Sequence, residues 1–259
     1  MRFLFAILLS SLVQVIAMSE ASASCERKAI IVRTIERDGI VCTPNKTDQP
    51  MPLLLAFHGH GSNGKDMALG TRLHEAWPEA LVVYLNGLTG TATPNDAAGK
   101  QTGWQINPGD MGDRDVAFVD AALDALEQHY RIDQQRIFAA GHSNGARFIG
   151  VLWAMRGQRF AGFGFSAAQA DTLMEKAPLR SAWMGMGTHD EVVPYSWQKN
   201  SIPLAAQLLK LGDVQATEGL HQYRNQDGLE LVTLVHTGGH IWPPGQTKSM
   251  VNFFRRHHL

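Results

Sequence analysis

The most informative stretch of the chain is RIFAAGHSNGA, residues 136–146. A short apolar run here ends in Gly-x-Ser-x-Gly, and we expect the segment from 146 to about 156 to be helical. A strand, a tight turn and a helix in this order form a nucleophile elbow, which lifts the hydroxyl of Ser143 clear of the sheet. Gly141 and Gly145 suit the turn, because a Cβ at either position would crowd the neighbouring strand and helix. The stretch therefore predicts a nucleophilic serine.

The rest of the chain alternates between apolar runs and segments of helical spacing. Leu53–Phe57 is an unbroken apolar run, typical of a strand buried on both faces of a mainly parallel sheet. We expect further strands at 80–85, 160–167 and 182–187, a hairpin over 223–235, and helices at 66–77, 113–130, 196–211 and 246–258. This alternation predicts the α/β class, as a doubly wound, mainly parallel sheet with helices on both faces. Because the nucleophile elbow lies in this context, we expect the α/β-hydrolase fold.

The first 23 residues have the pattern of an export signal. Arg2 supplies a positive charge, residues 3–18 are apolar, and Ala21-Ser22-Ala23 offers a small-x-small cleavage site. The apolar run is shorter than the roughly 20 residues of a membrane-spanning helix. We therefore expect a signal peptide over 1–23, a single catalytic domain over 24–259 that is secreted or periplasmic, and no membrane span after cleavage. A lipoprotein anchored through Cys25 is a weaker alternative, since Ser22 stands where a lipobox has Leu.

The chain has two cysteines, Cys25 and Cys42. An even pair in an exported protein favours a disulfide. Asp38-Gly39 has the composition of a turn between residues 28–36 and 40–43, which would bring the two cysteines together. Two unpaired thiols are the alternative, and in either case we expect no chemistry from them.

Length and charge restrict the function further. A chain of 259 residues suits one large α/β domain. Its formal net charge of -1 gives no electrostatic case for binding nucleic acid. The sequence leaves the oligomeric state open. Residues 86–112 are rich in Gly, Pro, Thr, Asn and Asp, and so long a connection is often functional.

A serine nucleophile needs a base, and the base needs an orienting acid. In α/β-hydrolases these residues follow in the order Ser, Asp or Glu, His, each in a loop after a strand. Asp190 directly follows the strand expected at 182–187, and His240 follows Gly238-Gly239 after the hairpin. The sequence thus predicts that Ser143, Asp190 and His240 form a catalytic triad. Alternative acids are Glu191 and Asp171, and alternative histidines are His189, His221 and His236.

Acyl transfer also requires backbone N–H donors for the oxyanion. We expect Asn144, which follows the nucleophile, to supply one donor and His60 to supply the other. His58-x-His60 resembles a metal-binding pair, but further ligands are missing nearby. A phosphate-binding loop is also excluded, since Lys65 is followed by Asp66 instead of Ser or Thr. We therefore expect no metal and no cofactor.

Several motifs together resemble those of secreted esterases of the polyhydroxybutyrate depolymerase and feruloyl esterase group, from about Pro52 to the final helix. They are His58-Gly59-His60-Gly61, Gly103-Trp104-Gln105, Asp113-Arg114-Asp115-Val116-Ala117-Phe118, Gly141-His142-Ser143-Asn144-Gly145, Gly187-Thr188-His189-Asp190, and Gly238-Gly239-His240-Ile241-Trp242-Pro243. The resemblance implies an extracellular carboxylic-ester hydrolase that uses no cofactor.

The substrate is less closely defined by the sequence. Trp104 and Trp242 are candidates for an apolar wall around an acyl or aromatic group, and packing in the core is the alternative for both. We expect a small ester or oligoester as substrate, such as hydroxybutyrate oligomers or feruloyl and acetyl esters. A peptidase or thioesterase with the same triad, and an inactive binding module, are the competing hypotheses.

Overall fold

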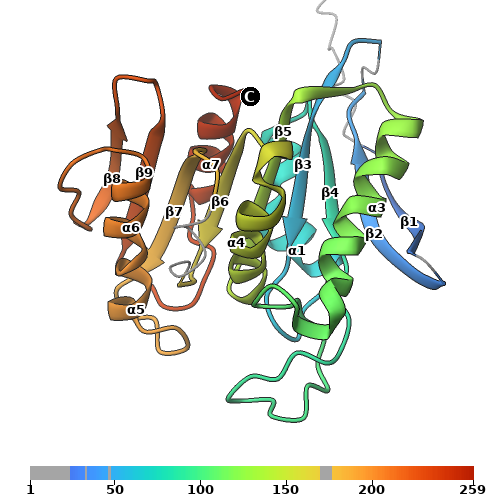
Figure 1. Ribbon diagram of the computed structural model, residues 1–259, viewed down its shortest axis with the longest axis horizontal. Coiled ribbons are helices and arrows are strands. Elements are labelled where there is room, and N and C mark those ends of the chain that lie inside the picture. Colours follow the sequence, from blue (N-terminus) through green and yellow to red (C-terminus); the bar gives the residue numbers. More distant parts are fainter. Residues whose placement is uncertain (1–23, 33, 46–47, 170–176) are drawn as a thin grey trace, which may run out of the picture.

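The computed structural model describes residues 24–32, 34–45, 48–169 and 177–259, and within this part of the chain nine strands form one mixed sheet. The strands are β1 (Ser24–Val32), β2 (Ile35–Thr43), β3 (Met51–Phe57), β4 (Leu81–Leu85), β5 (Ile132–His142), β6 (Gly162–Ser166), β7 (Ser181–Gly187), β8 (Gly219–Arg224) and β9 (Glu230–His236). Their order across the sheet is β1-β2-β4-β3-β5-β6-β7-β9-β8 (Figure 1).

The centre of the sheet is parallel. Strands β4, β3, β5, β6, β7 and β9 pair in parallel, whereas β2 joins β4, and β8 joins β9, in antiparallel pairing. The carboxyl ends of the parallel strands therefore meet along one edge, which is the lower edge in Figure 1. Ligand sites of open α/β sheets lie at this edge.

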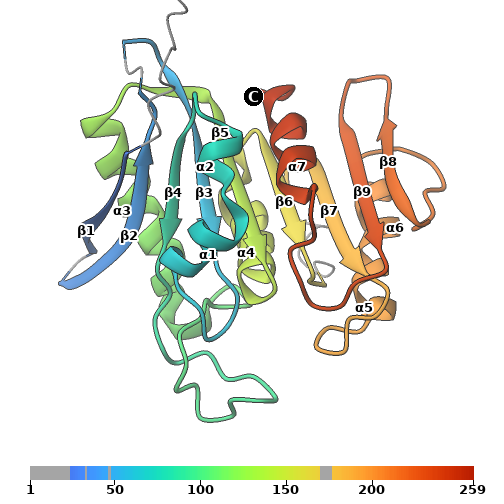
Figure 2. The ribbon, with the colours of Figure 1, turned by 180° about the vertical axis from the view of Figure 1, so that it is seen from behind.

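Helices cover both faces of the sheet. They are α1 (Gly64–Thr71), α2 (Leu73–Ala76), α3 (Arg114–His129), α4 (Asn144–Arg156), α5 (Tyr195–Lys199), α6 (Ser201–Leu208) and α7 (Gln246–Arg255), with 3-10 turns at Asp110–Asp113 and Gly157–Arg159. Helices α3, α4 and α6 lie on one face (Figure 1), and α1, α2 and α7 lie on the other (Figure 2). Alternate residues of β3 enter the two cores, with Leu53 and Leu55 in one and Leu54 and Ala56 in the other. The predicted α/β-hydrolase architecture is confirmed.

The first hairpin differs from the prediction. The chain reverses between Val32 and Ile35, and Asp38-Gly39 lies inside β2. Gly39 serves close packing instead of a turn, because a Cβ there would come within 2.8 Å of the Tyr84 carbonyl oxygen on β4. Composition alone does not distinguish these two uses of glycine.

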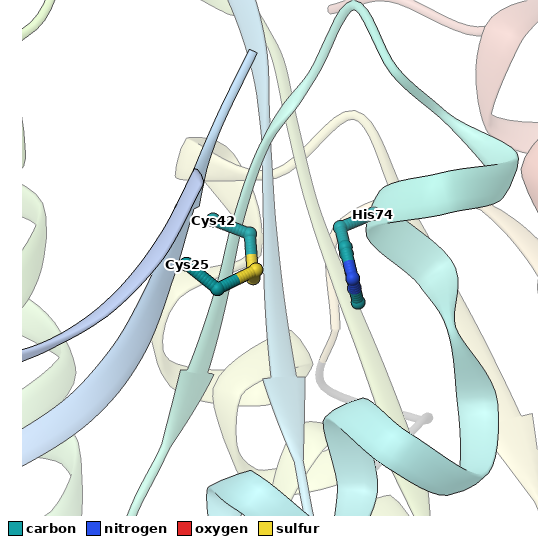
Figure 3. Close-up of side chains that lie close together, drawn as sticks. All are labelled: Cys25, Cys42 and His74. Carbon is teal, nitrogen blue, oxygen red and sulfur yellow. A yellow bond between two sulfur atoms is a disulfide. The ribbon is translucent and has the colours of Figure 1, made fainter. Parts of the chain in front are cut away.

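The two cysteines nevertheless meet. Cys25 and Cys42 are directly opposite each other in the β1–β2 register and form a disulfide. Figure 3 shows this bond beside His74. Because both sulfurs are covalently paired, neither is a free thiolate that could bind a metal together with this histidine.

Two predicted helices are each divided in two. The segment expected at 66–77 breaks at Arg72, which adopts a left-handed conformation with φ of 50° and ends α1. The segment expected at 196–211 breaks at Asn200, between α5 and α6. Pro203 lies in the first turn of α6, where a missing N–H is tolerated, but it would disrupt the interior of one continuous helix.

The predicted signal peptide, residues 1–23, lies outside the described residues. Within the described ranges, none of the helices combines the length and the apolar character that crossing a bilayer requires.

Candidate active site

Ser143 occupies a sharp turn between β5 and α4. Its backbone has φ of 55° and ψ of -120°, a conformation that L-residues rarely adopt. A Cβ on Gly141 would lie 2.5 Å from the Gly145 carbonyl carbon, and a Cβ on Gly145 would lie 2.2 Å from the Phe57 carbonyl oxygen. Both glycines are therefore required by the close approach of β5, α4 and β3, and the predicted strand–turn–helix geometry is present.

Three side chains from separate loops meet at this turn. The Ser143 hydroxyl lies 2.8 Å from His240 Nε2, and His240 Nδ1 lies 2.8 Å from Asp190 Oδ2. Because a carboxylate only accepts, Nδ1–H donates to Asp190, and Nε2 is then free to accept the serine proton. Asp190 lies 50 positions before His240 in the chain, and Ser143 lies 97 positions before it. Only the fold brings the three side chains together.

Asp190 is held by a second group of donors. Its Oδ1 accepts the backbone N–H groups of Val192 and Val193 at 2.9 and 2.8 Å, and its Oδ2 also accepts Gln198 Nε2 at 2.8 Å. Gln198 is buried and was not identified from the sequence. Its chain position carries no recognisable motif, so only the folding of α5 against the acid loop reveals it.

The loops that carry the acid and the histidine are joined along their backbones. Thr188 N–H donates to His236 O at 2.8 Å, and His189 N–H donates to Gly238 O at 3.1 Å. A Cβ on Gly187 would lie 2.4 Å from Gly238 O, so the two loops are in direct contact. This contact fixes the position of His240 relative to Asp190.

The alternative residues occupy other places. Glu191 is exposed, and His221 lies on the edge strand β8, where it contacts Thr217. His236 Nδ1 accepts Gly238 N–H, while His189 Nδ1 lies 2.6 Å from Thr237 O. None of these four side chains has a hydrogen bond with Ser143 among the described residues. Asp171 lies outside the described residues.

A cavity of about 260 Å³ opens at Ser143 and His240. It is lined by His58, Gly59, His60, Ser62, Asp66, Met67, Gly70, Thr71, His142, Ser143, His240 and Trp242. Helix α1 therefore forms one wall, and the segment after His240 forms another. Of the described residues in this lining, Asp66 carries a formal charge and none is a lysine or arginine.

His142 is a second imidazole in the cavity, and it was not singled out from the sequence. Its ring centroid lies 4.9 Å from that of His240, and its Nδ1 lies 3.3 Å from Ser166 Oγ. Burial, with a smaller contribution from His240, lowers the pKa of His142 to about 4. His142 is therefore neutral at pH 7.

The segments that carry the two expected oxyanion donors lie next to the serine. Asn144 is the first residue of α4, and the first N–H groups of a helix lack an intrahelical partner. The loop that contains His60 also lies against the elbow, since a Cβ on Gly59 would approach Ser143 Cβ to 3.3 Å. His58 connects this loop to the next strand's end by accepting Gly87 N–H at its Nε2, 2.9 Å away, and burial lowers the pKa of His58.

The two tryptophans have different environments. Trp104 is fully buried, stacks on Phe148 and donates from Nε1 to His58 O at 3.0 Å. The structure thus places Trp104 in the core behind the cavity, because its large ring fills the space between α3, α4 and β3, and the suggestion that it forms the substrate wall is corrected. Trp242 does line the cavity, with its Nε1 donating to Thr247 Oγ1.

The sequence of this chain is similar to a known protein family and to proteins named as esterases. A model described as the prolyl oligopeptidase family matches residues 98–226. A protein named "Probable feruloyl esterase C" from Aspergillus clavatus is 28% identical over 163 residues, which cover 62% of this chain and 57% of that protein. This chain has the α/β-hydrolase fold and is similar to proteins named as esterases. It spans little more than half the length of that feruloyl esterase relative.

Solved structures share the fold of this α/β-hydrolase. A ferulic acid esterase from Anaeromyces mucronatus, solved with ferulic acid, superposes with a TM-score of 0.63 at 15% identity, covering 93% of this chain and 92% of that one. An acetyl xylan esterase from Aspergillus awamori gives a TM-score of 0.64 at 12% identity, covering 89% and 99%. The resemblance to the feruloyl esterase group is confirmed at the level of the fold.

Proposed function

We propose that this protein is a serine esterase that hydrolyses carboxylic esters through an acyl-enzyme on Ser143. The observation that carries the proposal is the continuous chain of hydrogen bonds from Ser143 through His240 to Asp190, which opens into the cavity. The esterase relatives support the same chemistry.

In the proposed mechanism Ser143 Oγ attacks the ester carbonyl carbon as its proton passes to His240 Nε2. Asp190 holds the imidazole in the tautomer that accepts this proton and stabilises the cation that forms. The negative charge on the carbonyl oxygen is stabilised by backbone N–H groups of Asn144 and His60. His240 then protonates the leaving alcohol, and water, activated by the same histidine, releases the carboxylic acid from Ser143.

The cavity favours esters whose bound groups carry no negative charge. Asp66 would repel a free carboxylate, and the described lining supplies no lysine or arginine to bind one. Trp242 offers an apolar surface beside the serine, suited to an aromatic ring or an alkyl chain. Feruloyl and acetyl esters fit these properties, and so do hydroxybutyrate oligomers bound with their terminal carboxylate outside the cavity.

We further propose that the protein acts outside the cytoplasm, in the periplasm or the medium. The signal-like pattern of residues 1–23 supports this location, as does the disulfide between Cys25 and Cys42.

A substrate panel on the purified protein tests the proposal. Short p-nitrophenyl esters, methyl ferulate, acetylated xylan and hydroxybutyrate oligomers are compared, with Ser143→Ala as control. We expect turnover of at least one ester, reduced by several orders of magnitude in Ser143→Ala because the nucleophile is lost. Equal rates in both proteins would contradict the proposal.

The acid is tested by two matched substitutions, Asp190→Asn and Glu191→Gln. Asp190→Asn should lower kcat by about 10⁴-fold, since an amide favours the wrong histidine tautomer. Glu191→Gln should stay within about twofold of the original rate, because this side chain is exposed. The reverse pattern would transfer the role of the acid to Glu191.

Peptide hydrolysis is the second candidate function. The match to the prolyl oligopeptidase family over residues 98–226 favours it, since that segment includes Ser143 and Asp190. Chromogenic proline-containing peptides, assayed beside the esters, distinguish the two functions. Faster turnover of the peptides would replace the esterase proposal.

A further inference from the structure

Residues 86–112, here called the long loop, hold the cavity loop 58–62 in place. The long loop extends beyond the carboxyl edge of the sheet (Figure 1). Gly61 N–H donates to Thr102 O at 2.7 Å, and Thr102 Oγ1 donates to Ser62 O at 2.6 Å. The segment that carries one proposed oxyanion donor is thus bonded to the long loop at Gly61 and at Ser62.

A side-chain pair joins the same two segments. His60 Nε2 lies 3.0 Å from Asp96 Oδ2, and both side chains are largely buried, with 15% and 8% of their surfaces exposed. Since the carboxylate only accepts, His60 Nε2–H is the donor. The hydrogen bond between the His60 side chain and Asp96 therefore restrains the peptide plane of His60. The hydrogen bonds of Gly61 and Ser62 restrain it from the following residues.

Asp96 is itself held rigidly. Its Oδ1 accepts Lys100 N–H at 3.0 Å and its Oδ2 accepts Gln101 N–H at 2.8 Å. These backbone donors, Gln101 first and Lys100 next, lower the pKa of Asp96, with smaller contributions from His60. The carboxylate therefore stays ionised and fixed in position near neutral pH.

The long loop also contacts the other proposed donor. A Cβ on Gly103 would lie 2.8 Å from His60 Nδ1 and 3.0 Å from Asn144 Oδ1, so its backbone fits between these two side chains. The Asn144 amide makes two hydrogen bonds with the backbone of Trp104, accepting its N–H at 2.7 Å and donating to its carbonyl at 3.0 Å. One loop thus contacts both residues whose N–H groups would face the oxyanion.

We infer that Asp96 is a positioning residue for ester hydrolysis, acting through the imidazole of His60 to aim the His60 backbone N–H at the oxyanion. This inference rests on the proposed function. It gives the long loop a definite role, in which it pre-organises the oxyanion site without touching the substrate. Displacing a donor by about 1 Å is enough to lower a rate by about 10²-fold.

The test compares Asp96→Asn with Asp110→Asn, using p-nitrophenyl butyrate as substrate. Asp110 is a matched control, because it lies in the same loop and accepts the backbone N–H groups of Ile106 and Asn107. We expect Asp96→Asn to lower kcat by about 10- to 100-fold with KM within about twofold. Inhibition by phenylboronic acid, which forms a tetrahedral adduct with serine, should weaken in parallel. Asp110→Asn should retain the original kcat.

A double-mutant cycle tests whether Asp96 acts through His60. His60→Leu should lower kcat as Asp96→Asn does, and the double variant should be no slower than His60→Leu alone. His60→Gln retains a side-chain N–H donor and should recover most of the rate. If Asp96→Asn fails to fold, the contrast between His60→Leu and His60→Gln still decides the question.

The outcomes separate this inference from the proposed function. An active original protein with an equally active Asp96→Asn variant, or with a change confined to KM, overturns the inference and leaves the esterase intact. Additive losses in the double variant also overturn it. An original protein that hydrolyses no ester refutes the proposed function, and the positioning role with it.

Discussion

At the scale of single residues, the site depends on backbone conformations that side chains would normally disfavour. Ser143 has a positive φ, which costs on the order of 1–3 kcal/mol for a residue with a Cβ. The conformation persists because the backbones of Gly141 and Gly145 are packed between β5, β3 and α4. The packing around Ser143 thus fixes the conformation in which it lines the cavity.

His142 gives a prediction for stability against pH. Its pKa is about 4 in the folded protein and 6.5 ordinarily, so between these values the unfolded chain binds a proton that the folded protein does not. Stability should therefore fall as pH falls from about 6.5 to about 4, by up to about 3 kcal/mol from this residue. Urea unfolding of the original protein and His142→Gln at pH 4.5 and 7.5 measures the effect.

Between pH 7.5 and pH 4.5 the His142→Gln variant should lose much less stability than the original protein. His221→Gln, a change on the edge strand β8, should show the pH dependence of the original protein. Identical pH dependence in His142→Gln and the original protein would show that His142 is not buried in its neutral form. His240 and Asp190 are the titratable groups that act on His142, so both are left unchanged.

At the scale of elements, the β1–β2 hairpin forms one edge of the sheet. It lies at the edge, where β1 pairs with β2 and β2 alone connects the hairpin to β4. Cys42 is opposite Val82, near the start of β4, whereas Ser143 lies beyond the carboxyl ends of the parallel strands. The disulfide therefore secures the hairpin at the end of the sheet away from the candidate site.

Removing the disulfide should affect stability and leave catalysis unchanged. The cysteines are 17 positions apart, and a cross-link of this length stabilises a protein by about 3 kcal/mol through the entropy of the unfolded chain. Cys25→Ala combined with Cys42→Ala should lower Tm by roughly 6 to 12 °C. Calorimetry measures this change, and ester turnover at 25 °C is the control. A large loss of kcat without a change in Tm would refute the assignment of a purely structural role.

At the scale of the whole molecule, a buried ion pair connects the edge of the sheet to the helical layer and the long loop. Arg37 on β2 donates to Asp115 Oδ1 on α3 at 3.1 Å, and both side chains are almost fully buried. Asp115 Oδ2 accepts Gln105 N–H from the long loop at 2.9 Å. The guanidinium also lies 4.1 Å from the Phe118 ring centroid.

Breaking this pair should be strongly destabilising. Asp115→Asn leaves the Arg37 charge buried without a counter-ion, which costs about 3–5 kcal/mol. Denaturant unfolding of Asp115→Asn beside Glu75→Gln measures the difference. Glu75 pairs with Arg72 on the surface, where both side chains are about half exposed or more, so its loss should cost under about 1 kcal/mol. Equal losses in the two variants would contradict this account.

The sequence by itself determined the architecture, the elbow and the order of the residues that meet there. These features follow from local signals: unbroken apolar runs, a Gly-x-Ser-x-Gly turn, and an acid and a histidine each placed just after a strand. Because parallel strands end at one edge, the chain order of Ser143, Asp190 and His240 predicted that they would converge. Their catalytic roles stay a prediction.

Tertiary structure alone decided which glycines lie in turns and which allow another strand to pack closely against them, as Gly39 shows. It also decided that Trp104 is buried, that Gln198 holds Asp190, and that Asp96 reaches His60. The physical reason is the same in each case. These contacts join segments whose residues carry no local pattern, so their partners are set only when the sheet, its helices and the long loop pack against one another.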